Sequence, residues 1–379
     1  MDPIPFNRPY LVGTETAYIE QAVADGWLSS GGSFTARCEG WLRERTGTTQ
    51  ALLSHSCTAA LEGSGLLADL KPGDEVIMPS FTFVTTAAAF ALRGAVPVFV
   101  DIEPATLNID PERVAEAVTS RTRAIVAVHY AGVGCDMDEL LALAAGHELL
   151  VIEDAAQGLL AAYKGRPLGS MGQLGTLSFH ETKNVTCGEG GALLVNAPEL
   201  SARAEIVWDK GTNRRSFSRG EVERYTWVDL GSSFGAGEVS AAFLWGQLEQ
   251  ADAITARRLE IWRSYHEAFS DLEAEGRLRR PIVPSDRTHN GHMYYLLLPD
   301  LETRTRFIDE LGARGILAVF HYVPLHSSPT GARLGRAHGD LAYTRELSDR
   351  LVRIPLWTGM SDAVVARVIE SVRAVVGSL

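Results

Sequence analysis

Short apolar segments alternate with helical segments through the first half of the chain. The apolar segments that we expect as strands are 51–54, 75–78, 96–100, 124–128 and 149–152. The segments between them carry apolar residues at helical spacing and begin or end at turn-forming residues. Strands of this length that alternate with helices form a parallel or mixed sheet with helices on both faces. The alternation therefore predicts an α/β fold.

The pattern changes after Ser178. A further strand is expected at 191–195, and a long helical segment at 236–272. The remaining residues mix expected strands (293–298 and 318–321) with helices (303–314 and 362–376), which is typical of an α+β unit. We expect a large α/β domain over residues 1–250, a smaller α+β domain over 251–379, and an N-terminal segment that packs on the small domain.

Composition restricts the functional class. The 379 residues carry a formal net charge of −12, whereas nucleic-acid binding needs a basic face. No apolar run approaches the ~20 residues that span a bilayer, and the N-terminus lacks a basic segment followed by an apolar one. We therefore expect a cytoplasmic protein that binds neither nucleic acid nor membrane.

The chain contains only four lysines, Lys71, Lys164, Lys183 and Lys210. Lys71 lies in a Lys-Pro-Gly-Asp turn, Lys164 in a Tyr-Lys-Gly-Arg hairpin, and Lys210 after an amphipathic helix, all typical surface positions. Lys183 instead follows a buried strand and precedes a glycine cluster, where other groups can approach closely. A partly desolvated lysine can form an imine with an aldehyde, so Lys183 is the candidate nucleophile.

An acidic residue ends the strand at 149–152. Ligands of open α/β sheets collect at the carboxyl ends of strands, and Asp154 lies there. A buried carboxylate needs a partner, and the protonated ring nitrogen of pyridoxal phosphate is one. Capping of the residues that follow is the structural alternative for Asp154. Gln157, about one helical turn later, is a candidate to contact the ring oxygen of this cofactor.

A phosphate group would need backbone N–H groups at a helix start together with hydroxyl groups. Thr58 and Ala59 open a helix after the first strand, and Ser178 lies five residues before Lys183. Phe83 is an aromatic residue that either stacks on the ring or belongs to the core. Together with Lys183 and Asp154, these residues predict a site for pyridoxal phosphate.

Other chemistries lack support. His289 with His292, and His321 with His326, have metal-like spacings without a third ligand nearby, so no metal site is predicted. No Gly-x-Gly-x-x-Gly motif opens a helix after a strand, and the sequence contains neither a Walker motif nor a Gly-x-Ser-x-Gly nucleophile elbow.

Several segments together resemble the DegT/DnrJ/EryC1/StrS family of sugar aminotransferases, and the resemblance runs nearly end to end. The segments are 79–84, 99–101, 151–157, 178–184, 188–191 and 322–326. The resemblance implies the fold type I of pyridoxal-phosphate-dependent aminotransferases, with a large mixed sheet of the seven-stranded type. It also implies a homodimer with active sites at the subunit interface.

The resemblance implies residue roles as well. Lys183 would bind the cofactor aldehyde and carry the proton, Asp154 would bind the ring nitrogen and Gln157 the ring oxygen side. Thr58, Ala59 and Ser178 would hold the phosphate, joined by Ser233 of the neighbouring subunit, which stands where the family has Asn. Substrate-binding candidates are Arg214, Tyr322 and His326.

The implied reaction is transfer of an amino group from L-glutamate to C4 of a dTDP-4-keto-6-deoxyhexose, giving a dTDP-4-amino-4,6-dideoxyhexose. Transamination at C3 of a nucleotide-linked 3-keto sugar is the alternative within the family. A dehydratase branch carries His in place of Lys183. A non-enzymatic regulatory module would require loss of Lys183 or an added DNA-binding segment, and the sequence has neither. The sequence leaves open whether the C4 amine is axial or equatorial, and whether the pathway leads to a surface polysaccharide or a secondary metabolite.

Overall fold

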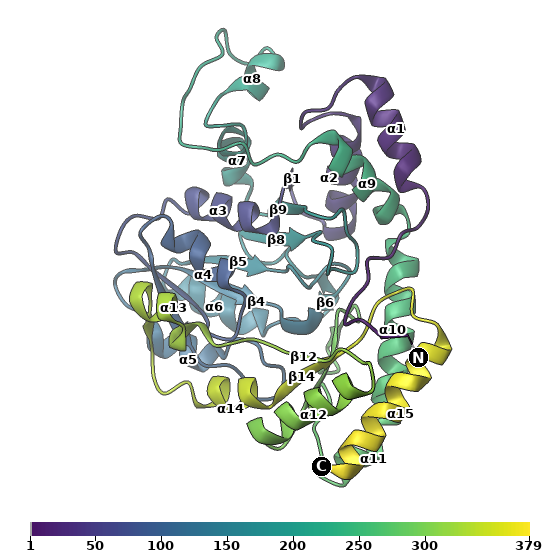
Figure 1. Cartoon of the computed structure of the whole chain (residues 1–379). Coiled ribbons are helices and arrows are strands. Elements are labelled where there is room, and N and C mark those ends of the chain that lie inside the picture. Colours follow the sequence, from purple (N-terminus) through teal and green to yellow (C-terminus); the bar gives the residue numbers. More distant parts are fainter. Residues whose placement is uncertain (1) are drawn as a thin grey trace.

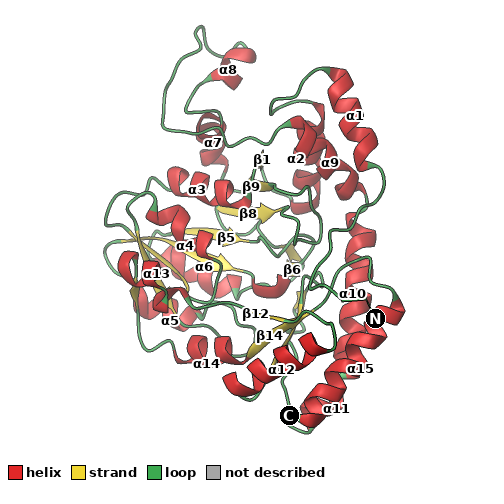
Figure 2. Cartoon of the chain, viewed as in Figure 1, coloured by secondary structure: helices red, strands yellow, loops and turns green. Residues whose placement is uncertain are grey.

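A computed structural model describes residues 2–379, and its largest element is an eight-stranded mixed sheet (Figures 1 and 2). The strand order is β1 (Gln50–Ser54), β9 (Gly191–Val195), β8 (Leu174–Ser178), β5 (Leu150–Asp154), β4 (Thr122–Val128), β2 (Glu75–Pro79), β3 (Val96–Val100) and β13 (Arg336–Ala337). Only β9 runs antiparallel to the strands beside it. The predicted α/β fold with a large mixed sheet is confirmed.

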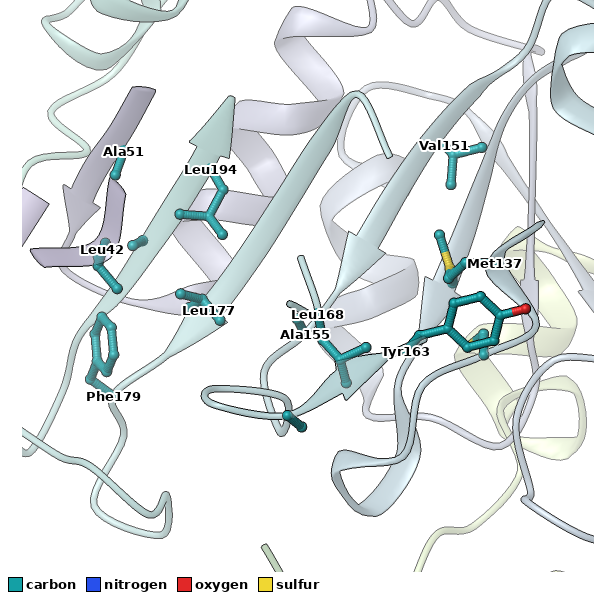
Figure 3. Close-up of a cluster of buried hydrophobic side chains, with 14 of the residues drawn as sticks. Leu42, Ala51, Met137, Val151, Ala155, Tyr163, Leu168, Leu177, Phe179 and Leu194 are labelled. Carbon is teal, nitrogen blue, oxygen red and sulfur yellow. The ribbon is translucent and has the colours of Figure 1, made fainter. Parts of the chain in front are cut away.

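Helices cover both faces of this sheet because the strand residues alternate between two buried clusters. Leu53, Ile125, Val151 and Leu194 belong to one cluster, in which Leu177 and Leu194 lie near Leu42 in Figure 3. That cluster also takes residues from α2 (Ser33–Thr46), α5 (Pro111–Ala117), α6 (Met137–Gly146) and α9 (Glu238–Glu249). α1 (Glu15–Asp25) packs on α9.

The opposite face of the sheet carries the second cluster, which includes Leu52, Val126, Ile152 and Leu193. It packs against α3 (Cys57–Leu67), α4 (Val84–Ala91) and α7 (Ser201–Trp208). The near-continuous apolar strands are explained by this double coverage, since a strand buried on both faces has no polar side.

A second sheet lies in the C-terminal part of the chain. Its order is β11 (Tyr294–Leu297), β14 (Leu351–Ile354) and β12 (Val319–Phe320). Its core includes residues of α10 (Ala251–Ala268), α12 (Leu301–Ala313) and α15 (Asp362–Ser378). Ile4 joins the same core and forms a parallel bridge with Ile316. The sequence did not predict β14, the central strand, because its four residues follow directly on α14 (Ala342–Arg350) without a turn.

Two further details differ from the sequence predictions. The helical segment expected at 236–272 is three helices, α9, α10 and α11 (Ser270–Ala274), because Gln250 and Phe269 leave helical geometry. The edge strand β13 follows α13 (Pro329–Leu334) and joins the large sheet from beyond residue 250. A small third sheet contains β10 (Arg287–Thr288), β6 (Ala162–Tyr163) and β7 (Arg166–Pro167), and α8 (Arg214–Ser218) projects beyond the large sheet (Figure 1).

The helices found in residues 2–379 include none that combines the length and apolar character needed to cross a membrane.

Candidate active site

The carboxyl ends of β1, β5 and β8 lie at one edge of the large sheet because these strands run parallel. Ser56, Asp154 and Ser178 therefore come to the same edge, as expected for ligand sites in α/β sheets. A cavity of about 710 Å³ opens there and reaches across to the second sheet. Its walls include Thr58, Phe83, Gln157, Ser178, Lys183 and Tyr322.

Lys183 lies in a turn after β8 whose backbone is closed by a hydrogen bond from its N–H to the carbonyl of His180, 2.9 Å long. Phe179, which is fully buried, anchors this turn to the core (Figure 3). Burial lowers the pKa of the Lys183 amine, although the charge of Asp154 acts in the opposite direction. The lowered pKa favours the neutral amine, which is the nucleophilic form.

The other lysines are all paired with carboxylates. Lys164 Nζ lies 2.8 Å from Asp138, and Lys71 and Lys210 lie within 3.9 Å of neighbouring aspartates. Within the described chain, Lys183 is the one lysine without such a partner. The three lysines interpreted from the sequence as surface residues thus each lie near a carboxylate.

The adjacent acidic residues Glu153 and Asp154 point to opposite faces of the sheet, since β5 alternates. Asp154 is 6% exposed and lies on the α4 side, where Thr86 Oγ1 donates to its Oδ2 at 2.8 Å. Its Oδ1 accepts a hydrogen bond from the N–H of Ala156 at 3.2 Å. This bond closes a local turn, and no helix begins there, so Asp154 is not a helix cap. Asp154 is thus a buried carboxylate whose side-chain partner is neutral.

Glu153 has a structural environment instead. It accepts hydrogen bonds from His129 Nε2 and from the backbone N–H groups of Gly169, Met171 and Gly172, all between 2.6 and 2.8 Å. Four donors satisfy the carboxylate fully, so Glu153 orders the chain between β7 and β8 away from the cavity.

The side chain of Gln157 is held at both ends. Its Oε1 accepts the N–H of Ala131 at 2.7 Å, and its Nε2 donates to the hydroxyl of Tyr322 at 3.3 Å. The ring of Phe83 is 54% exposed and lies 6.3 Å from the ring of Tyr322. Phe83 is therefore a wall of the cavity and not a core residue.

The start of α3 also contributes to the wall of the cavity. Thr58 and Ser178 both line it. Ala59 is buried, and its N–H already donates to Ser56 Oγ at 3.0 Å, which caps the helix. Hydroxyl groups and a helix N-terminus meet here as predicted for a phosphate, with the N–H of Ala59 engaged by the cap.

Three candidates lie elsewhere in the subunit. Ser233 is exposed on the segment between α8 and α9, where it forms a bridge with Asp209. Arg214 Nε pairs with Asp209 at 2.6 Å and lines a separate cavity of about 360 Å³. His326 Nδ1 lies 2.7 Å from Ser80 Oγ, a contact that holds the segment after β12 against the end of β2. The structure does not bring these three together with Lys183.

The cavity also has wall residues that the sequence did not single out. Arg258, His292 and Arg353 come from the C-terminal part of the chain. Burial lowers the pKa values of His292 and His321 well below the ordinary value, so both are neutral. The sequence could have indicated Thr86, because its hydroxyl group lies in the first helical turn after Phe83. No local pattern distinguishes Arg353 from the other arginines of the sequence. The described residues contain no group of three or more His, Cys, Asp or Glu side chains suited to a metal.

Known proteins resemble this chain over nearly its whole length. The DegT/DnrJ/EryC1/StrS aminotransferase family profile matches residues 9–373. The chain is 34% identical to the spore coat polysaccharide biosynthesis protein SpsC of Bacillus subtilis, covering 98% of this chain and 97% of that protein. It is 33% identical to GDP-perosamine synthase of Caulobacter vibrioides, with 97% of each chain covered. The PLP-form of Spr1654 from Streptococcus pneumoniae superposes with a TM-score of 0.91 at 27% identity over 99% of both chains.

The residues present also fit pyridoxal phosphate group by group. The cavity offers an unpaired amine at Lys183 for the aldehyde. The buried carboxylate of Asp154, whose charge acts on that amine, is available for the ring nitrogen. Phe83 offers an aromatic face, and Thr58 and Ser178 offer hydroxyl groups beside a helix N-terminus. Each polar group of the cofactor thus has a complementary partner.

Proposed function

Because the chain belongs to the DegT/DnrJ/EryC1/StrS aminotransferase family, whose enzymes depend on pyridoxal phosphate, we propose that it transfers an amino group from L-glutamate to C4 of a dTDP-4-keto-6-deoxyhexose. The product is a dTDP-4-amino-4,6-dideoxyhexose. The observation that carries the catalytic part of the proposal is the unpaired amine of Lys183 in a cavity whose wall includes Ala156 and Gln157, just after β5. The charge of the buried Asp154 at the end of β5 acts on that amine.

The residues of this chain have separate tasks in such a reaction. When bound, pyridoxal phosphate supplies a ring that accepts electrons as a Cα–H bond breaks. Asp154 holds the proton on the ring nitrogen, and Thr86 orients that carboxylate. Lys183 Nζ removes the proton from one carbon and returns it to another, and burial assists by lowering the pKa of this amine. Phe83 covers the ring, while Thr58 and Ser178 hold the phosphate.

The substrate part rests on motif similarity. The segments 179–184, 210–214 and 320–326 resemble those of dTDP-4-amino-4,6-dideoxygalactose transaminase. A GDP-linked 4-keto sugar is a second candidate acceptor, favoured by the 33% identity to GDP-perosamine synthase. C3 transamination of a 3-keto sugar is the alternative regiochemistry, and a PLP-binding regulatory module is the non-enzymatic one.

We further propose a homodimer whose active sites lie at the subunit interface. Large apolar side chains of the subunit are exposed in the loop that follows α1 and in the segment between α8 and α9. They include Trp27, Leu28, Tyr225, Trp227 and Leu230, of which Trp227 is 72% exposed. Patches of this kind mark association surfaces. Ser233 lies in the same segment, from which it would reach the phosphate of the neighbouring subunit, and light scattering of the purified protein tests the dimer.

The decisive experiment combines spectroscopy with product analysis. We expect the purified enzyme to show a visible absorbance band of the bound cofactor. Adding L-glutamate should remove this band, and adding dTDP-4-keto-6-deoxyglucose should restore it. NMR of the product should locate the new amine at C4. Lys183→Ala removes the band and the turnover, whereas the control Lys164→Ala, at a paired surface lysine, keeps both. A wild-type enzyme without a band would refute the cofactor role. Turnover of only the GDP-linked sugar, or an amine at C3, would refute the substrate assignment.

A further inference from the structure

A network of hydrogen bonds joins the Lys183 turn to the segment that carries Gln157. Asn184, the residue after Lys183, is 6% exposed. Its Nδ2 donates to the backbone carbonyl of Asn290 at 2.9 Å, and its Oδ1 lies 3.1 Å from Nδ1 of His292. These partners are 106 and 108 positions away in the chain. The two contacts therefore fasten the turn after β8 to the stretch that precedes β11.

Asn290 is the centre of this network and is 1% exposed. Its Nδ2 donates to the carbonyls of Gln157 and Leu159, both at 2.8 Å. Its Oδ1 accepts a hydrogen bond from the backbone N–H of His292 at 3.1 Å. Gln157 is part of the cavity wall. Asn290 therefore connects the chain after β5 with the chain after β8.

The stretch 290–292 has no regular secondary structure, yet side chains donate to all three of its carbonyls. The carbonyl of Asn290 accepts from Asn184. The next two carbonyls accept from the guanidinium of Arg258 on α10, at 3.0 and 2.6 Å. Buried backbone groups outside helices and sheets need such partners. Here the partners anchor the stretch to the turn after β8 and to α10.

The network also fixes which nitrogen of His292 carries the proton. A backbone carbonyl only accepts, so the atom of Asn184 that faces Asn290 is the amide nitrogen, and the atom that faces His292 is the amide oxygen. Nδ1 of His292 must therefore bear a hydrogen and donate it. Burial, and after it the charge of Lys183, lowers the pKa of His292 well below its ordinary value. The ring is neutral, with its hydrogen on Nδ1.

We propose that Asn184 is a positioning residue for Lys183, an inference that rests on the proposed catalytic role of that lysine. The carbonyl of Asn290 and Nδ1 of His292 hold the Asn184 side chain at two points. The backbone that carries Lys183 cannot rotate away from the cavity without breaking both hydrogen bonds. His292 acts through Asn184, by donating from Nδ1, and not by contact with a ligand.

The flexibility of a lysine side chain explains why such an anchor matters. Four rotatable bonds separate Nζ from the backbone, so a small rotation of the turn displaces the amine by a larger distance. A misplacement of about 1 Å at a reacting group can cost up to about 100-fold in rate. Because Asn290 holds the Gln157 segment as well, the network keeps two cavity segments at a fixed spacing.

Three variants separate the positioning role from the alternatives. Asn184→Leu removes both hydrogen bonds at similar side-chain volume. His292→Phe keeps the ring and removes the Nδ1 donor. His292→Asn keeps a donor, because the amide nitrogen of Asn is bonded to Cγ as Nδ1 of His is, and removes Nε2. Loss of the donor and loss of Nε2 are thereby measured separately.

Asn196→Leu is the matched control. Asn196 follows β9, and its Nδ2 donates to the carbonyls of Gly169 and Gly172 at 2.9 and 2.7 Å. It is absent from the cavity wall. This variant therefore also loses two hydrogen bonds of a side-chain amide to a distant loop, but it leaves the Lys183 turn intact.

The first readout is the glutamate half-reaction of the loaded enzyme, followed by the visible band. We expect Asn184→Leu and His292→Phe to lower its rate at saturating L-glutamate by about tenfold or more. The half-saturating concentration changes by less than about threefold, because the donor contacts are unchanged. His292→Asn recovers the wild-type rate to within about threefold, and Asn196→Leu reacts as wild type does.

The second readout is hydrogen–deuterium exchange of the cofactor-free protein over residues 179–188, which requires no reaction. We expect this segment to exchange about tenfold faster or more in Asn184→Leu and His292→Phe. His292→Asn and Asn196→Leu keep the wild-type exchange there. If Asn184→Leu does not fold, the two His292 variants still decide the assignment.

Four results would overturn the inference. His292→Asn as slow as His292→Phe would assign the effect to Nε2 and to direct contact with a ligand. An equal slowing in Asn196→Leu would assign it to a general loss of stability. Unchanged rate and exchange in Asn184→Leu would show that the turn needs no anchor. A wild type without a visible band would refute the proposed function and this role with it, whereas the first three results leave the proposed function standing.

Discussion

At the scale of single residues, the acidic pair of β5 shows how adjacent identical charges acquire different tasks. Glu153 is surrounded by four donors on one face of the sheet. Asp154 faces the cavity side and has Thr86 as its side-chain donor. Full satisfaction makes Glu153 a folding residue, and incomplete satisfaction leaves Asp154 available to a ligand.

Amide substitution of the two residues should separate these tasks. We expect Asp154→Asn to slow the glutamate half-reaction by about 100-fold or more, since a neutral amide cannot hold the ring-nitrogen proton. Glu153→Gln instead leaves three backbone donors and His129 facing an amide, and lowers the free energy of unfolding by about 3 kcal/mol. Single-turnover absorbance and urea unfolding measure the two effects. Equal stability losses in both variants would contradict the division of tasks.

At the scale of secondary structure, the close contact between β9 and α3 shapes the expected phosphate end of the cavity. Gly191 opens β9 beside the first turn of α3, and a Cβ built on it would collide with the backbone nitrogen of Cys57. Glycine is therefore required at this position by space, because the backbone at the helix start leaves no room for a side chain.

Gly191→Ala should therefore shift the start of α3. We expect a loss of about 1–3 kcal/mol in the free energy of unfolding and weaker cofactor retention, measured by urea unfolding and by dialysis followed by absorbance. Gly40→Ala in α2 is the control, since nothing lies within 4 Å of a Cβ there, and it should stabilise the protein by about 0.5–1 kcal/mol. If Gly191→Ala leaves the free energy of unfolding unchanged, the start of α3 can move to accept the methyl group, and the prediction is wrong.

At the scale of the whole molecule, Glu75 connects distant parts of the chain. Its carboxylate on β2 accepts from Arg121 at 2.6 Å, from Thr119 at 2.7 Å, and from Arg336 of β13 at 3.0 and 3.1 Å. Burial acts to raise the pKa of Glu75, but these hydrogen bonds together outweigh it and lower the pKa to about 2. The edge strand from the C-terminal part is thereby fastened to the large sheet.

The lowered pKa of Glu75 predicts a pH-dependent contribution to stability. Because the folded chain holds this proton less tightly than the unfolded chain, the contribution is complete above about pH 4.5 and is lost as the pH falls toward 2. We expect Glu75→Gln to cost about 3 kcal/mol at pH 7, and this difference from wild type to shrink to less than half at pH 3. Urea unfolding at both pH values tests it, and a difference independent of pH would contradict the linkage.

The division of the whole chain at residue 250 stays a proposal. Ala251 and Ile254 of α10 still pack in the core of the large sheet, whereas Ile261 and Tyr265 of the same helix pack in the C-terminal core. One continuous helix therefore belongs to both cores, and its local pattern contains no boundary signal. Limited proteolysis around α10 measures whether the two parts separate.

The sequence alone determined the local elements and singled out Lys183 as the candidate nucleophile. Strands such as Val96–Val100 and Gly191–Val195 were predicted with their observed bounds. A short apolar run between two turns is a local pattern, so residues adjacent in the chain are enough to identify it. Lys183 followed from elimination, since a lysine in a buried context is rare. Tertiary structure alone decided which polar groups meet. It separated Glu153 from Asp154, placed His326 on Ser80, and brought Arg353 from an unpredicted strand into the cavity of Lys183. The contact of His326 with Ser80 joins residues 246 positions apart, and periodicity within a local segment cannot predict such a contact.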